Sequence, residues 1–174
     1  MVASAALSGA TALPASAATP TPTGYYEATA TGGVFAFGGA ALDGSPAASQ
    51  LTLSSSIVAV VGTPTGKGYW LVGADGGVFS FGAPFFGSTG ALHLVQPIVG
   101  MEALPNGEGY RFEAADGGVF DFGQASFAGS MGGQALVAPV VGMAADLATG
   151  GYWLVAADGG IFSFGDAGYY GRIS

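Results

Sequence analysis

The 174-residue sequence predicts an all-β protein made of antiparallel repeats, and two observations lead to this prediction. First, a GGxFxFG phrase occurs four times, and the copies are 44, 41 and 42 residues apart, a period of about 42. Propeller blades of four strands recur about every 40 to 45 residues. Second, glycine-rich turns separate short runs of β-branched and aromatic residues within each period, as expected for meanders of short strands. The phrase ends at Gly38, Gly82, Gly123 and Gly165.

Each repeat is expected to contribute four short strands. In one copy these are an apolar first strand (97–103), a second strand (110–115), a third strand (119–122) and a short fourth strand (126–128). A glycine-rich turn joins the second strand to the third, because glycine accepts a positive φ. We therefore expect Gly77→Val to destabilise strongly. The predicted structural turns are Asp75, Gly76 and Gly77; Asp116, Gly117 and Gly118; and Asp158, Gly159 and Gly160, while the first copy has Thr31 in place of the aspartate.

Alternation in the third strand assigns its two faces. Two phenylalanines per copy point to one side, and a β-branched residue points to the other. Both faces are therefore apolar, as expected for a sheet that lies between two neighbours. The residue between the two phenylalanines is expected at a rim. The phenylalanines are Phe35, Phe37, Phe79, Phe81, Phe120, Phe122, Phe162 and Phe164; the other face carries Val34, Val78, Val119 and Ile161; and the rim residues are Ala36, Ser80, Asp121 and Ser163.

The strands do not complete four blades. Apolar first strands occur three times (57–61, 98–101 and 140–143), against four hairpins. This predicts a β-propeller or partial propeller of four blades, one incomplete, as a small ring, an open array or half of a ring closed by a second chain. An unpaired sheet edge recruits other strands, so we expect self-association through the terminal blades. The repeat domain spans 24–174, with repeats at about 24–56, 57–96, 97–138 and 139–174.

The N-terminus differs from the repeats. Residues 1–17 are rich in alanine and end in Ala15-Ser16-Ala17, a small-residue cleavage pattern, and a Thr/Pro linker follows at 18–23. We interpret residues 1–17 as a signal peptide, which places the protein outside the cell or on its surface. No basic residue precedes Lys67, so a disordered alanine-rich leader is the alternative.

Charge excludes two classes of partner. Three basic residues stand against eleven acidic ones, a formal net charge of −8. Nucleic acids and anionic membrane surfaces both require lysine and arginine. The repeats also contain no apolar run of the roughly 18 to 20 residues that a membrane-spanning helix needs. We expect no nucleic-acid partner and no membrane insertion.

The sequence offers no catalytic constellation. His93 is the only histidine, and the other copies have Thr52 and Ala135 at its position. No GxSxG, HExxH, P-loop or CxxC pattern occurs. Each aspartate turn supplies one carboxylate flanked by glycine, which favours capping of the turn over calcium binding. We expect no enzyme, no metal and no cofactor.

Aromatic residues are the candidates for ligand contact, because aromatic rings stack on sugars. They lie at the start of the second strand and after the third strand, and core packing is the alternative role. The candidate ligand-binding residues are Tyr69, Trp70, Tyr152, Trp153, Phe86 and Tyr170.

Two phrases carry a resemblance to a known family. GYWLVGADGGVFSFG (68–82) and GYWLVAADGGIFSFGDAGYYG (151–171) resemble a repeat of secreted actinobacterial proteins, which occurs in arrays, sometimes beside cell-wall hydrolase domains. The strand layout is similar to NHL and kelch blades. The resemblance implies an extracellular propeller-like array and no catalytic residues.

Three functions follow, and the first two belong to different classes. The favoured one is a non-catalytic binding or scaffolding module for cell-wall glycan, polysaccharide or a protein. The alternative is a structural, self-assembling repeat or spacer, and a third is an accessory region of an extracellular hydrolase.

Overall fold

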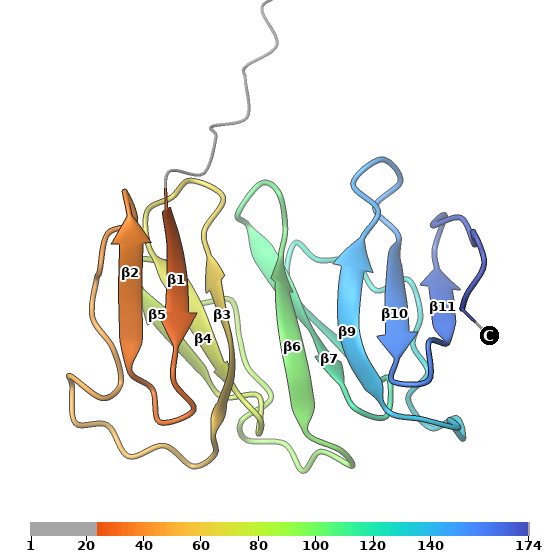
Figure 1. Ribbon diagram of the computed structural model, residues 1–174, viewed down its shortest axis with the longest axis horizontal. Helices are drawn as coiled ribbons and strands as arrows, with labels where there is room; N and C mark the ends of the chain where they lie inside the picture. Colours follow the sequence, from red (N-terminus) through yellow and green to blue (C-terminus); the bar gives the residue numbers. More distant parts are fainter. Residues whose placement is uncertain (1–23, 174) are drawn as a thin grey trace, which may run out of the picture.

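The computed structural model describes residues 24–173, which fold into eleven strands and no helix (Figure 1). The predicted all-β class is confirmed. The strands form four antiparallel sheets, numbered here in chain order. Sheet 1 contains β1 (Gly24–Ala28) and β2 (Val34–Gly38); sheet 2 contains β3 (Ile57–Gly62), β4 (Tyr69–Gly73) and β5 (Val78–Phe81); sheet 3 contains β6 (Ile98–Ala103), β7 (Gly109–Ala114) and β8 (Val119–Gly123); and sheet 4 contains β9 (Val140–Ala145), β10 (Tyr152–Ala156) and β11 (Ile161–Phe164).

Sheets 2 to 4 are three-stranded meanders, and sheet 1 is a hairpin with no first strand among residues 24–173. The predicted mismatch of three first strands against four hairpins is therefore confirmed. The predicted signal peptide (1–17) and linker (18–23) lie outside the described residues. In the described part, no helix has the length and apolar character needed to cross a membrane.

The predicted fourth strand is wrong. Residues 126–128 form no strand, and each full repeat has three strands. Backbone amides of this segment, and of its counterpart in the preceding repeat, bond to the next sheet instead of to a strand ladder. The amides of Phe86 and Gly87 both donate to the Tyr110 hydroxyl, at 3.2 and 3.1 Å, and the Ala128 amide donates to the Tyr152 hydroxyl at 3.3 Å.

The sheets stack face to face in chain order, and their first strands adjoin one another along one side of the molecule (Figure 1). The face with the phenylalanines packs against the preceding sheet. Phe79 and Phe81 of sheet 2, for example, are half-buried beside Tyr69, Leu71 and the sheet 1 residue Val34. The stacked-sheet prediction therefore holds at these positions.

Sheet 1 is the exception, because no described sheet precedes it. Phe35 and Phe37 are 54% and 40% exposed. The expectation that all eight phenylalanines lie between sheets is wrong at these two. The rim prediction is wrong as well, since the side-chain oxygens of Ser80 and Ser163 are buried. Alternation turns them away from the phenylalanines, Ser80 toward sheet 3 and Ser163 toward the outer face of sheet 4, where it lies opposite Trp153.

Candidate functional site

Three of the six aromatic candidates have no surface for a ligand. Tyr69, Trp70 and Tyr152 are 0% exposed. The Tyr69 hydroxyl donates to the Gly44 carbonyl, and the Trp70 indole N–H donates to the Pro84 carbonyl at 2.7 Å. Burial between sheets and these bonds make the three residues structural, so the prediction of ligand contact is corrected to the core-packing alternative.

The other three candidates retain exposed surface to different degrees. Phe86 is half-buried, with ring centroids 6.4 Å from Trp70 and 5.5 Å from Tyr110. Trp153 is half-buried, and Tyr170, whose ring centroid is 6.4 Å away, is 88% exposed. Available aromatic surface among the six is therefore concentrated on sheet 4.

The aspartate turns cap their own backbone. The amides of Gly77, Gly118 and Gly160 each donate to Oδ1 of the aspartate two residues earlier, at 3.0 Å. In the first copy the Gly33 amide donates to the Thr29 hydroxyl at 2.9 Å instead. This geometry is an Asx-type turn, in which a side chain replaces a backbone acceptor.

The position of the strained glycine was predicted one residue too late. Positive φ belongs to the first glycine of each turn, with values of 75°, 78° and 81° at Gly76, Gly117 and Gly159. Gly77 has no positive φ, and a Cβ there would lie 3.2 Å from Oδ1 of Asp75. The backbone argument for Gly77→Val therefore fails at Gly77 and applies to Gly76.

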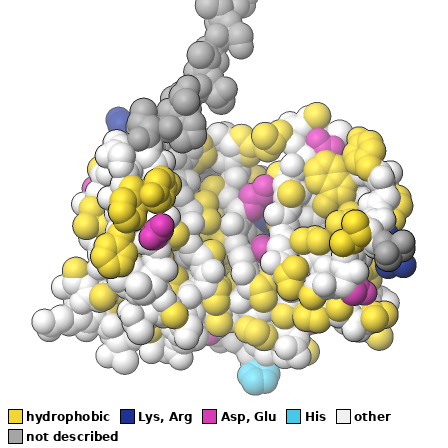
Figure 2. All heavy atoms as spheres, in the orientation of Figure 1, with side chains coloured by type: hydrophobic (Ala, Val, Ile, Leu, Met, Phe, Trp, Pro, Cys, Tyr) yellow, Lys and Arg dark blue, Asp and Glu magenta, His cyan; other side chains and the backbone are white. Residues whose placement is uncertain are grey.

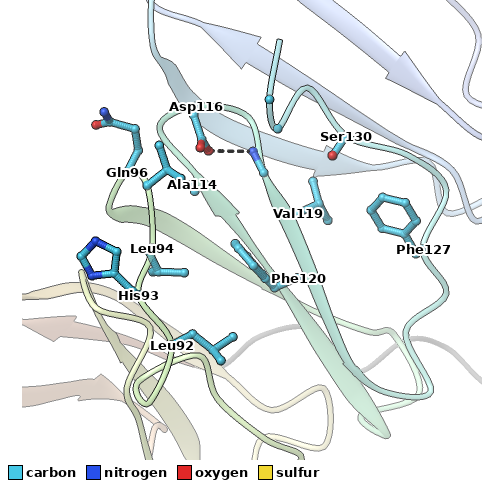
Figure 3. Close-up of a pocket in the computed structure, with 14 residues that line it drawn as sticks. Leu92, His93, Leu94, Gln96, Ala114, Asp116, Val119, Phe120, Phe127 and Ser130 are labelled. Carbon is cyan, nitrogen blue, oxygen red and sulfur yellow. Dashed lines mark hydrogen bonds between the residues drawn. The ribbon is translucent and has the colours of Figure 1, made fainter.

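A groove of about 360 Å³ opens between the segment 92–96 and sheet 3, at the end of the sheets where the aspartate turns lie (Figure 3). Leu94 points toward Phe120 across it, whereas the His93 ring points away. Phe127, on the other wall, is 62% exposed. Asp116 adds a carboxylate, one oxygen of which accepts from Gly118. The groove is thus largely apolar, with one acidic acceptor at its edge.

A similar groove recurs one repeat later, in which Arg172 takes the place of Ser130. A groove of about 340 Å³ is lined by Asp158, Phe162 and Tyr169, each 42 residues beyond its counterpart in the first groove. Tyr169 is 58% exposed, close to the value for Phe127. The structure therefore presents one aromatic and acidic arrangement twice, in register with the repeat.

The sequence reasoning missed a buried cluster of charges on the face of sheet 3 that meets sheet 4. Arg111 and Glu113 are each 4% exposed. The Arg111 Nε donates to Oδ1 of Asp121 at 3.2 Å, and the guanidinium lies 4.5 Å from the centroid of the Tyr152 ring. The Ala145 amide donates to Oε1 of Glu102 at 2.8 Å. The signal was Arg111 itself, which replaces the aromatic residue found there in the other copies.

Burial dominates the electrostatics of this cluster. Burial, with a smaller contribution from the nearby Glu102 carboxylate, raises the pKa of Glu113 to about 7. Burial also raises the pKa of Glu102 and that of Asp121, where Arg111 acts in the opposite direction. Within residues 24–173, the second oxygen of each carboxylate accepts no hydrogen bond.

Across residues 24–173, no group of three or more histidine, cysteine, aspartate or glutamate side chains is arranged to hold a metal ion. Comparison with family models, with curated proteins and with solved structures finds no match to this chain. The fold and the recurring groove are therefore the features that bear on function.

Proposed function

We propose that this chain is a non-catalytic binding module, secreted or on the cell surface, which holds a neutral cell-wall glycan or polysaccharide in grooves repeated along a partial β-propeller. The observation that carries the proposal is the recurrence of one groove at two successive repeats. The proposed location outside the cell is supported by the N-terminal sequence and by the family resemblance described above.

The partial propeller is supported by how the sheets are arranged. The first strands β3, β6 and β9 adjoin one another, whereas the backbones of the third strands do not make comparable contacts in the described part. The sheets therefore spread outward from their first strands, as blades do around an axis. Four sheets, one of which has no first strand in the part of the chain that the structure describes, correspond to four blades with one incomplete.

A neutral glycan fits the chemistry of the grooves. An exposed aromatic ring, Phe127 or Tyr169, provides a flat apolar face for a sugar ring. The free oxygen of Asp116 or Asp158 can accept a hydrogen bond from a sugar hydroxyl. The net charge of −8 disfavours an anionic polymer. A ligand with repeating units can occupy both grooves at once, which increases its overall affinity.

The test is binding of the chain to soluble neutral polysaccharides by calorimetry and to insoluble cell-wall glycan by co-sedimentation. We expect saturable binding that falls by at least about tenfold in the double variant Phe127→Ala/Tyr169→Ala, because an aromatic anchor contributes about 2 kcal/mol or more. Both residues are largely exposed, so the fold should be unchanged.

Leu147→Ala is the matched control. Leu147 is 76% exposed, and it lies in the β9–β10 turn at the opposite end of the sheets from the aspartate turns (Figure 1). Its truncation should leave binding unchanged. Absence of saturable binding to every preparation would contradict the glycan proposal, and binding unaffected by the double variant would contradict the grooves as the site.

A further inference from the structure

Neighbouring sheets are joined by a contact of the same kind at each of the three internal junctions. A glycine of one repeat has a φ of 129°, 138° or 134° and lies directly beneath a phenylalanine ring of the next repeat. A Cβ on that glycine would approach the ring to 2.9, 2.5 or 2.6 Å. The glycine carbonyl accepts a hydrogen bond from a tyrosine hydroxyl. This tyrosine lies opposite the same phenylalanine on the neighbouring strand. The sets are Gly44 with Phe81 and Tyr69, Gly87 with Phe122 and Tyr110, and Gly129 with Phe164 and Tyr152.

Both halves of this joint are present at the ends of the described chain. Tyr25 pairs with Phe37 across β1 and β2, and their rings stack with centroids 5.0 Å apart. They are 58% and 40% exposed, whereas Tyr69 is fully buried at its own joint. At the other end Gly171 has a φ of 105°, and a Cβ there would meet no atom within 4 Å.

The surrounding faces match the internal joints. On sheet 2 the face that receives sheet 3 carries Trp70, whose indole N–H donates to the carbonyl of Pro84. Sheet 4 carries Trp153 at the same position, and its indole N–H donates to the carbonyl of Gly168 at 2.7 Å. Trp153 is half-buried where Trp70 is fully buried. The outer face of sheet 4 therefore resembles the face of sheet 2 that sheet 3 covers.

We infer that sheet 1 of one copy of this chain docks on the outer face of sheet 4 of a second copy, with Phe37 over Gly171 and the Tyr25 hydroxyl bonded to the Gly171 carbonyl. The occupant is a second copy because the three internal joints show which surface each end accepts. Figure 2 shows hydrophobic side chains gathered over β1 and β2 around an acidic one. The two surfaces differ, so the contact is head to tail and produces a ring or an open assembly. This inference does not depend on the grooves.

Glu27 limits the strength of the joint. It is exposed on β1, and its counterparts at the internal joints, Leu71, Phe112 and Leu154, are 0% exposed. Docking would bury a carboxylate where the internal joints bury an apolar side chain, which is unfavourable. Glu27→Leu should therefore strengthen association. A variant that failed to fold would lose association instead, so the two results can be told apart.

The experiment is sedimentation velocity of the full chain over a wide range of concentration. The wild-type mass should rise above that of a monomer, Phe37→Ala and Gly171→Ala should each weaken association by at least about tenfold, and Glu27→Leu should strengthen it. Gly150→Ala is the matched control for Gly171→Ala, since Gly150 also has a positive φ of 80° and open space at its Cβ. It should associate as the wild type does.

Mixing the two weakened variants separates this joint from other contacts. Phe37→Ala retains an intact sheet 4 face, and Gly171→Ala retains an intact sheet 1 face, so the mixture should form heterodimers and nothing larger. A wild-type chain that stays monomeric at the highest concentration overturns the inference. An association that neither variant weakens also overturns the inference. That result is expected if the chains associate through the open edge of β1. Glycan binding is measured separately, and its loss or retention leaves these outcomes unchanged.

Discussion

Protonation of Glu113 should control how the stability of the domain depends on pH. Its pKa is about 7 in the folded protein and about 4.5 in an unfolded chain. Between these values the folded state holds a proton that the unfolded state has lost, so the free energy of unfolding falls as pH rises. This contribution is fully present below about pH 4.5 and is lost above about pH 7. The cause is burial beside Glu102.

The size of the effect follows from the pKa. One pKa unit corresponds to about 1.4 kcal/mol, so the full difference is about 3 kcal/mol. About 2 kcal/mol of it falls between about pH 5.5 and pH 8.5. For a domain of this size, that corresponds to a fall of about 4 to 8 °C in melting temperature. Glu102 and Asp121 also have raised pKa values and act in the same direction.

Glu113→Gln isolates the contribution of Glu113, because glutamine has the shape of the protonated acid and does not titrate. Its melting temperature, measured by circular dichroism at both pH values, should fall by about 4 to 8 °C less than that of the wild type. The buried amide can change the overall stability, so the comparison uses the difference between the two pH values. Glu108→Gln, at an exposed position in the β6–β7 turn, is the control and should follow the wild type. Equal pH dependence in wild type and Glu113→Gln would refute a raised pKa at Glu113.

Two further predictions concern the turns and the joints, and both are measured by urea unfolding. Gly76→Ala should lower the free energy of unfolding by about 1 to 2 kcal/mol because of its positive φ alone, and by more because its Cβ would contact Thr89. Gly77→Ala should lower it by less. Equal losses would contradict the placement of the strained residue. Tyr110→Phe should cost about 2 to 3 kcal/mol, because it leaves the Gly87 carbonyl and the Phe86 and Gly87 amides without a buried partner. Tyr25→Phe, at the equivalent but exposed position, should be close to neutral, and a similar cost at both tyrosines would show that the hydroxyl bond is not the source.

Local patterns in the sequence predicted those features that are set by local forces. Hydrophobic alternation placed the first three strands of each full repeat, and glycine turns placed the hairpins, since both depend on neighbours in the chain. The fourth strand was mispredicted because its amides bond to a tyrosine 23 or 24 residues further along the chain. The propensities of neighbouring residues carry no information about a partner so far along the chain.

The prediction of ligand contact at Tyr69 and Trp70 was wrong for the same reason. Tyr69 and Trp70 have the composition of a sugar-binding pair, but the next and preceding sheets cover them. The grooves were not predicted, because their walls come from segments about 20 to 40 residues apart that meet only after the sheets stack. Asp121 was assigned to a rim because alternation gives the face of a side chain but not what lies over that face.

The charges of sheet 3 also bear on how the stack comes apart. In a repeat protein each sheet is stabilised mainly by its two neighbours, so the weakest joint decides where separation begins. The joint between sheets 2 and 3 buries Trp70, Tyr110 and Phe112, all apolar or hydrogen-bonded. The joint between sheets 3 and 4 buries Arg111 and Glu113, with carboxylate oxygens that have no partner among the described residues. Ionisation of Glu113 should weaken the joint between sheets 3 and 4, so we expect this joint to separate before the joint between sheets 2 and 3 as pH rises. Sheet 4 also carries the proposed acceptor face with Gly171, so the titration of Glu113 should also weaken head-to-tail docking.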